Sequence, residues 1–290
     1  MKHRLALFCA TAVLVACAHQ PTGLDVDRSH ASPGFESRVQ FVVLHYTALD
    51  QARSLQVLTQ PRGVSAHYLV GDAPVRIYQL VDEQYRSWHA GVSHWGINAG
   101  LNSSSIGIEI VNPGYKDTPQ GHVYAPYPKA QIDAVIALLR DISARHRIRP
   151  ERILGHADLA PGRKQDPGPQ FPWRRLADEG LIPWPDAALV AARRAPLESG
   201  QVPLPDAVWV QTRLAQVGYK TPSTGQWDAA TREVLSTFQM KYRPANFSGA
   251  LDAETAALLD VATTPGGMRV ADVAPQRPAR NTGEDAAIAP

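Results

Sequence analysis

The sequence predicts an α/β protein: a mixed central β-sheet flanked by helices, followed by a small three-helix domain. Short apolar runs rich in β-branched residues recur between residues 39 and 156, and one long amphipathic segment interrupts them. A shorter region near the C-terminus carries the pattern Gly-x-apolar-Asp-x-x-Thr twice, which is typical of capped helices. The length of 290 residues is enough for one domain of ordinary size and a smaller one.

The first 16 residues have the composition of a secretion signal. Lys2 and Arg4 form a basic start, and the apolar stretch LALFCATAVLVA at 5–16 is too short to span a bilayer of about 30 Å. These two cations are the only charged groups of the segment, so the rest of the chain holds 27 basic and 27 acidic residues. Such a balance gives no electrostatic reason to expect nucleic acid or an anionic membrane surface as a partner.

The motif LVAC at 14–17 resembles a bacterial lipobox, in which the cysteine is acylated. We therefore expect a lipoprotein signal peptide at 1–16 and a lipid anchor on Cys17; an ordinary secretory signal with a chance cysteine is the alternative. Cys9 would leave with the signal, so no thiol would remain for a disulfide. Residues 17–35 are polar and contain Pro and Gly, which is typical of a tether.

The next part of the chain alternates strand and helix signals and predicts a domain over 36–184. The segment 130–146 has apolar residues at helical spacing and predicts a helix that covers one face of the sheet. The predicted strands share β-branched or alternating apolar residues and lie at 39–46, 67–71, 75–81, 105–111 and 153–156.

The C-terminal part predicts a linker over 185–204 and a three-helix domain over 205–262. Asp228 and Asp252 stand in the two copies of the repeated pattern, where each carboxylate can accept hydrogen bonds from the free amides of a first helical turn. Residues 263–290 have no apolar period and contain several Pro and Gly, so we expect a disordered tail there.

Two histidines are each placed at the end of an apolar strand. His45 follows FVVL and His156 follows ILG. Side chains at the carboxyl end of a buried strand reach the rim of the sheet, where ligands commonly bind in α/β folds. The alternative for either residue alone is a core histidine that donates to a backbone carbonyl.

Glu109 lies in the strand SIGIEIV, in which three Ile share one face while Gly107 and Glu109 share the other. A solvent-facing position would make Gly a poor choice, because Gly weakens a strand. A cleft-facing position would let the glycine leave room for a ligand and would partly desolvate the carboxylate. Desolvation raises the pKa of a carboxyl group toward the range useful for proton transfer.

Two His, one Asp and an open fourth position form a catalytic zinc site, and a nearby Glu can supply the base. The loop GHADLAPGRKQDPG offers two candidates for the acidic ligand. Asp158 lies two residues beyond His156, whereas Asp166 follows a loop stiffened by Pro161. Spacing alone leaves both open.

The blocks VVLHYTA, VSAHYLV, RSWHAGVSHW, SIGIEIVN and GHADLAPGRKQDPG occur in this order. Together they resemble the type 2 N-acetylmuramoyl-L-alanine amidases, the zinc family that includes peptidoglycan recognition proteins, over about residues 36–184. The resemblance implies one Zn²⁺ ion on His45, His156 and Asp166. It also implies Glu109 as the catalytic acid–base and Lys164 as a cation that stabilises the developing oxyanion.

The segments VQTRLAQVGY, TGQWDAATREVLSTFQ and GALDAETAALL resemble a peptidoglycan-binding domain of three helices. Together with the LVAC motif, the two resemblances imply an outer-membrane lipoprotein that faces the periplasm, and we expect a monomer because nothing in the sequence requires more. They imply that it hydrolyses the amide bond between N-acetylmuramic acid and L-alanine in peptidoglycan or muropeptides. A non-catalytic peptidoglycan-binding lipoprotein is the alternative, and the complete set of His, Asp, Glu and Lys argues against it.

Three further residues are candidates for substrate contacts. Trp88, His89 and Trp95 lie in or next to RSWHAGVSHW, and aromatic faces stack on sugars and peptides. The alternative is a loop that these rings fix in place by being buried.

Overall fold

The computed structural model describes residues 26–27, 29–119 and 121–272. The expected signal peptide at 1–16 and the expected lipid anchor on Cys17 lie outside the described residues. None of the helices in the described part of the chain is long and apolar enough to cross a membrane.

The chain divides into two compact units, and the one that begins at Ser37 contains every helix and strand given below. Its central sheet has the strand order β3-β2-β6-β1-β9. β1, β6 and β9 are parallel, β2 is parallel to β6, and β3 is antiparallel to β2. The bounds of the five strands are Phe41–Tyr46 for β1, Tyr68–Val70 for β2, Ile77–Gln79 for β3, Ser105–Ile110 for β6 and Ile153–Gly155 for β9. The predicted mixed sheet is confirmed.

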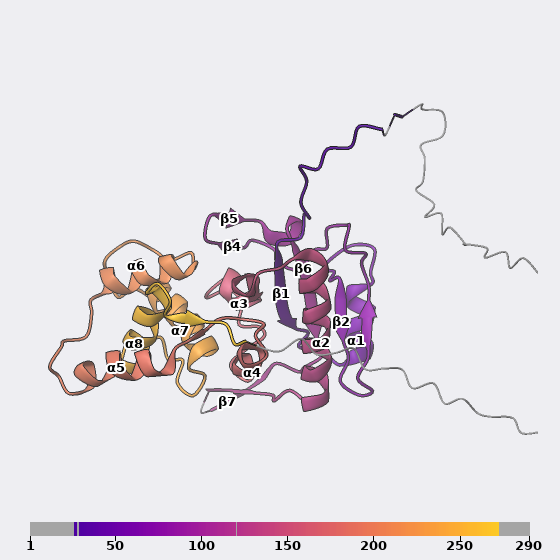
Figure 1. The fold of residues 1–290 in the computed structure, drawn as a ribbon. Coiled ribbons are helices and arrows are strands. Elements are labelled where there is room, and N and C mark those ends of the chain that lie inside the picture. Colours follow the sequence, from indigo (N-terminus) through magenta and orange to yellow (C-terminus); the bar gives the residue numbers. More distant parts are fainter. Residues whose placement is uncertain (1–25, 28, 120, 273–290) are drawn as a thin grey trace, which may run out of the picture. The chain divides into compact units, whose positions relative to one another are not determined.

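Two helices flank this sheet, α1 (Gln51–Leu58) and α2 (Lys129–His146). The buried residues Ile132, Val135 and Leu139 of α2 belong to the same core cluster as Val42 and Leu44 of β1, and α2 runs beside the sheet in Figure 1. The alternate residues of β1 belong to a second cluster. The strand is therefore buried on both faces, as expected for a parallel strand inside an α/β sheet.

Short elements connect these strands and helices. They comprise β4 (His94–Trp95), β5 (Asn98–Ala99), η1 (Leu101–Ser103), β7 (Tyr115–Thr118), β8 (Gly121–Tyr124), η2 (Pro150–Arg152), α3 (His156–Leu159) and α4 (Trp173–Asp178). α3 begins at the residue that follows β9, so its first side chain lies at the carboxyl edge of the sheet.

The C-terminal region has four helices in the described chain: α5 (Ala187–Glu198), α6 (Ala207–Val217), α7 (Ala229–Tyr242) and α8 (Ala253–Thr263). The last three match the predicted helical domain. Asp228 accepts a hydrogen bond from the Thr231 amide at 2.7 Å, and Asp252 accepts one from the Thr255 amide at 2.9 Å. Both predicted N-caps are confirmed.

Two predictions about the ends of this region need correction. The expected linker at 185–204 contains α5, because Asp186 caps a helix there by accepting from the Leu189 amide at 3.0 Å. The expected disordered tail at 263–290 begins later than predicted, because β11 (Met268–Arg269) pairs with β10 (Trp184–Pro185). Residues beyond 272 lie outside the described part of the chain.

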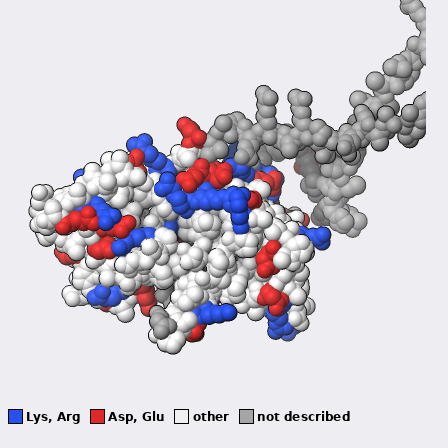
Figure 2. Space-filling view, turned by 90° about the horizontal axis from the view of Figure 1, so that it is seen from below, with Lys and Arg blue, Asp and Glu red and all other residues white. Residues whose placement is uncertain are grey.

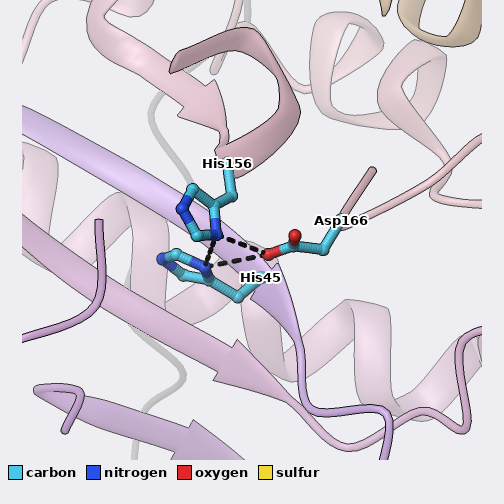
Figure 3. Close-up of side chains that lie close together, drawn as sticks. All are labelled: His45, His156 and Asp166. Carbon is cyan, nitrogen blue, oxygen red and sulfur yellow. Dashed lines mark hydrogen bonds and ion pairs between the residues drawn. The ribbon is translucent and has the colours of Figure 1, made fainter. Parts of the chain in front are cut away.

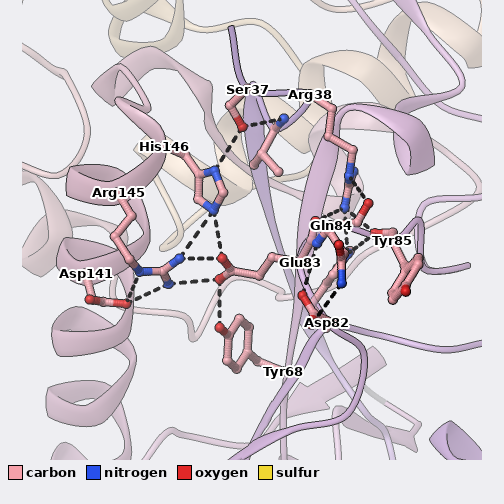
Figure 4. Close-up of polar contacts among 12 residues, drawn as sticks. Ser37, Arg38, Tyr68, Asp82, Glu83, Gln84, Tyr85, Asp141, Arg145 and His146 are labelled. Carbon is pink, nitrogen blue, oxygen red and sulfur yellow. Dashed lines mark hydrogen bonds and ion pairs between the residues drawn. The ribbon is translucent and has the colours of Figure 1, made fainter. Parts of the chain in front are cut away.

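A polar network holds the start of this unit against α2 (Figure 4). Glu83 accepts hydrogen bonds from the Tyr68 hydroxyl at 2.7 Å and from Arg145 Nη2 at 2.9 Å. His146 Nε2 lies 2.7 Å from the same carboxylate, and its Nδ1 lies 2.9 Å from the hydroxyl of Ser37. Although burial would raise it, the hydrogen bonds from Arg145, His146 and Tyr68 lower the pKa of Glu83 to about 2.

Charged side chains of both signs lie next to one another on the face of the molecule drawn in Figure 2. Lys and Arg side chains form a band across the middle of that view, and Asp and Glu lie directly beside it. Ion pairs between described side chains of opposite charge include Arg140 with Glu179 and Arg174 with Asp178.

Candidate metal centre

Three side chains place one ligand atom each around a common point (Figure 3). His45 Nδ1, His156 Nδ1 and Asp166 Oδ2 lie 3.0 Å from one another in all three pairs. All three residues are buried. Zinc with bonds of about 2.0–2.1 Å in tetrahedral geometry separates its ligands by about 3.3 Å. The triangle therefore needs only a small expansion to hold such an ion.

The sheet and one loop bring these ligands together. His45 lies near the carboxyl end of β1, and His156 follows the end of β9, its parallel neighbour. Carboxyl ends of parallel strands meet at one edge, so the two imidazoles converge. Asp166 returns to this edge through the loop, where its carbonyl accepts from the Ala157 amide at 2.8 Å. Of the two candidates left open by spacing, Asp166 is the one whose carboxylate faces both histidines.

The far nitrogen of His156 fixes the protonation of its ring. Nε2 lies 3.2 Å from the carbonyl oxygen of Ala90, which can only accept a hydrogen bond. Nε2 of the neutral imidazole therefore carries the proton. Nδ1 is left with a lone pair that points at the metal position.

A longer chain of hydrogen bonds fixes the proton of His45 in the same way. The Ser105 hydroxyl donates to the Leu101 carbonyl at 2.6 Å and so accepts from His89 Nε2, 3.1 Å away. His89 Nδ1 must then accept from His45 Nε2 across 3.0 Å. Burial lowers the pKa of His89 well below its usual value, and burial with the neighbouring His156 lowers that of His45 to about 4. Both rings are therefore neutral, and Nδ1 of His45 also presents a lone pair.

Three lone-pair donors thus meet at one buried point with no proton between them. A cation at this point would stabilise the arrangement, since buried charges and lone pairs that face one another repel. Two imidazole nitrogens and one carboxylate oxygen are ligands that suit Zn²⁺. The residues therefore fit the metal that the sequence predicts.

The carboxylate of Asp166 is stabilised by positive charge at this point. Although burial would raise it, a proton on His156 or His45 would lower the pKa of this carboxyl below its usual range, and a bound cation would act in the same direction. The negative charge of the Asp166 carboxylate is therefore available to a metal cation at neutral pH.

Glu109 lies beside this cluster on β6. It is opposite His45 in the parallel register of β1 and β6, so both side chains are on the same face of the sheet. Among the described side-chain atoms, its Oε2 is buried and has no hydrogen-bond partner. Burial and the charge of Asp166 raise the pKa of Glu109 well above its usual value, while Lys164 opposes the shift.

Gly107, on the same face as Glu109, has a different purpose from the one the sequence suggests. A Cβ at this position would lie 2.4 Å from Cγ and 2.7 Å from Nδ1 of His89. The space left by the missing side chain is filled by the His89 ring rather than by a ligand. Sequence patterns contain no signal for this contact, because it depends on how a distant loop folds over β6.

The remaining predicted site residues take different positions. Lys164 lines a pocket with Gln165 and residues of α7. Trp88 is 51% exposed, and the Arg86 guanidinium lies 4.1 Å from its ring centre. Trp95 is half-buried and packs edge-on against Tyr219, with ring centres 5.0 Å apart.

His89 is buried behind His45, as described above. Substrate contacts by Trp88, His89 and Trp95 stay predictions.

Comparison with known proteins gives matches over both parts of the chain. A family model described as N-acetylmuramoyl-L-alanine amidase matches residues 35–169, and one described as a putative peptidoglycan binding domain matches residues 204–259. N-acetylmuramoyl-L-alanine amidase AmiD of Escherichia coli is 39% identical over 274 residues, which cover 90% of this chain and 97% of the relative. The 1,6-anhydro-N-acetylmuramyl-L-alanine amidase AmpD of Enterobacter cloacae is 37% identical over 100 residues, which cover 34% of this chain and 49% of that protein.

Solved structures match the fold of both parts together. The structure of AmpDh3 from Pseudomonas aeruginosa in complex with anhydromuramic pentapeptide has a TM-score of 0.73 and 39% identity, covering 82% of this chain and 96% of that one. AmiD from E. coli in complex with anhydro-N-acetylmuramic acid-L-Ala-D-gamma-Glu-L-Lys has a TM-score of 0.73 and 40% identity, covering 83% of this chain and 95% of that one.

Proposed function

The chain belongs to the N-acetylmuramoyl-L-alanine amidase family, and from this we propose a zinc-dependent enzyme with His45, His156 and Asp166 as ligands. It hydrolyses the amide bond between N-acetylmuramic acid and L-alanine in peptidoglycan fragments. The observation that carries the metal proposal is the convergence of three unprotonated donor atoms, each 3.0 Å from the other two. A bound Zn²⁺ supplies a Lewis acid and lowers the pKa of water to about 7.

Glu109 is proposed as the group that moves the proton. Its buried Oε2 has no partner among the described residues, so it is free to accept a proton from a water molecule at the sheet edge. The raised pKa lets the same carboxyl hold that proton at neutral pH and return it to the amine of L-alanine as the amide bond breaks.

Lys164 is proposed to stabilise the negative charge that develops on the carbonyl oxygen. Its charge acts on the site, because it lowers the pKa of both Glu109 and His45. A cation in a site shielded from water stabilises a developing oxyanion far more than it would in solvent.

The non-catalytic alternative is less well supported by these observations. A protein that only binds peptidoglycan has no need of a desolvated carboxylate, which is costly to bury. Here that carboxylate lies opposite a metal ligand in the sheet. The match of residues 204–259 to a peptidoglycan binding domain supports substrate capture as a second role beside hydrolysis.

We propose further that the protein is a monomeric lipoprotein anchored through Cys17 in the outer membrane and facing the periplasm. The LVAC motif at 14–17 and the polar segment that follows it support this proposal. Mass spectrometry of the N-terminal peptide tests it: we expect an acylated Cys17 in the membrane fraction and a soluble protein for Cys17→Ala. An unmodified cysteine would contradict the anchor.

Digestion of sacculi and anhydro-muropeptides, with products identified by mass spectrometry, tests the proposed activity. We expect free stem peptides that begin with the amine of L-alanine, lost on chelation and restored by Zn²⁺. Glu109→Ala should also be inactive, whereas Glu151→Ala, which removes an exposed carboxylate, should match the wild type. A folded, zinc-loaded wild type that releases no stem peptide would overturn the proposal in favour of a binding protein.

A further inference from the structure

Asp158 is a buried carboxylate inside the metal-binding turn. It belongs to α3, whose first residue is the ligand His156. Its Oδ2 accepts a hydrogen bond from the amide of Gly155 at 2.8 Å, and the side chain is 3% exposed. The carboxylate thus holds the backbone on both sides of His156, from Gly155 to its own position.

The groups that compensate this buried charge come from the helical C-terminal region. Lys241 Nζ of α7 donates to Oδ2 at 2.8 Å, and the Tyr219 hydroxyl, just after α6, donates to Oδ1 at 2.7 Å. Lys241 is also buried, with 7% of its side chain exposed. Its ammonium also lies 4.3 Å from the ring centre of Trp173. No solvent screens this ion pair, so its two charges depend on each other.

Backbone packing continues this connection to the other ligand of the loop. The amide of Ala157, between His156 and Asp158, donates to the carbonyl of Asp166 at 2.8 Å. A Cβ at Gly155 would lie 2.8 Å from Pro167 and 3.1 Å from Trp173. The turn has little room to shift without moving both His156 and Asp166.

From this juxtaposition we infer that Lys241 and Tyr219 are positioning residues for the metal site, acting on His156 through Asp158. The inference rests on the proposed function, since it concerns the same metal ligands. It assigns the helical region a role besides the binding of peptidoglycan: this region completes the support of a ligand that the sheet domain cannot support alone.

Lys241→Met tests the inference, because it keeps much of the side-chain length and removes the charge. We expect the affinity for Zn²⁺, measured by chelator competition on the full chain, to fall about 10–100-fold, as is usual when the support of a metal ligand is lost. The absorption spectrum of the Co²⁺-loaded protein should change, because it reports the geometry of the ligands. Tyr219→Phe should weaken Zn²⁺ binding by less, about fivefold, since it removes a single hydrogen bond.

Two further variants separate positioning from general stability. Lys241→Met combined with Asp158→Asn leaves no unpaired charge and keeps an acceptor for the Gly155 amide, so it should recover part of the Zn²⁺ affinity. Arg213→Met is the matched control, because it breaks an ion pair with Asp260 at 3.1 Å inside the helical region. It should leave Zn²⁺ affinity and the Co²⁺ spectrum unchanged even if it lowers the melting temperature.

A folded Lys241→Met variant with wild-type Zn²⁺ affinity and an unchanged Co²⁺ spectrum would overturn the inference. Should that variant fail to fold, Tyr219→Phe decides: unchanged affinity overturns the inference, and weakened affinity supports it. A wild type that binds Zn²⁺ but releases no stem peptide would refute the proposed function alone, because affinity and spectrum are measured without substrate.

Discussion

Gly107→Ala should weaken the metal site although it changes no ligand. The added Cβ would lie 2.4, 2.6 and 2.7 Å from three atoms of the His89 ring. Relief to ordinary contact needs a shift of about 1 Å, because buried carbon atoms pack at about 3.5–4.0 Å. A ring displacement of this size is enough to break the hydrogen bond between His45 Nε2 and His89 Nδ1, now 3.0 Å long, because such bonds tolerate only a few tenths of an ångström.

The added Cβ therefore has two effects of predictable size. Overpacking of the buried ring costs about 1–3 kcal/mol of folding stability. Loss of the partner that fixes the proton on His45 should weaken Zn²⁺ binding about 10–100-fold. Chelator competition measures the second effect, and thermal unfolding of the metal-free protein measures the first.

The effect of Gly107→Ala must act through His89, which allows a strict test. In a His89→Ala background the Cβ meets no ring, so Gly107→Ala should cause no further loss of Zn²⁺ affinity. Equal losses in both backgrounds would refute the reasoning. So would a folded Gly107→Ala variant that binds Zn²⁺ as tightly as the wild type.

Three other outcomes follow from the same structure. Glu109→Gln should lower kcat by about 10²–10⁴-fold, the usual contribution of a general base, with Zn²⁺ affinity retained in chelator competition; a parallel loss of Zn²⁺ would contradict its assigned role. The pKa of Glu83 is lowered from 4.5 to about 2 in the folded protein, so its ionised carboxylate stabilises the fold. This stabilisation is fully present above about pH 4.5 and is lost as the pH falls toward 2. Glu83→Gln should therefore unfold more readily than the wild type at pH 7, by about 1–3 kcal/mol in denaturant titrations, and the difference should narrow below pH 4.5; a constant difference would contradict this. Removal of Zn²⁺ should lower the melting temperature, because a ligand that binds only the folded state stabilises it, and unchanged melting would argue against a buried metal.

The sequence predicted best those features that depend on local pattern. Successive side chains of the strands at 41–46 and 105–110 point to opposite faces of the sheet, so the sequence could place His45 at a strand end and Glu109 on the same face as Gly107. The two Asp caps were equally local. The choice of Asp166 over Asp158 required the family resemblance, because spacing does not determine how a loop returns to a sheet.

Features that depend on contacts between distant segments were not predictable in this way. α5 at 187–198 is an exception, because its Asp186 cap and its Ala-rich sequence are local helix signals that the prediction of a linker overlooked. β11 exists because residues 268–269 pair with residues 184–185. The role of Gly107 follows from the packing of a loop residue far from it in sequence.

The two histidine ligands are supported from opposite parts of the unit. His45 is held through His89 and Ser105 to the Leu101 carbonyl, all within the sheet domain. His156 is held through Asp158 to Lys241 in the helical region. A carbonyl oxygen that can only accept lies at the end of the first support, and a cation that can only donate lies at the end of the second. The first support therefore has one allowed direction of hydrogen bonding and sets the proton of the His45 ring. The second fixes the backbone around His156, whose ring proton is set by the carbonyl oxygen of Ala90.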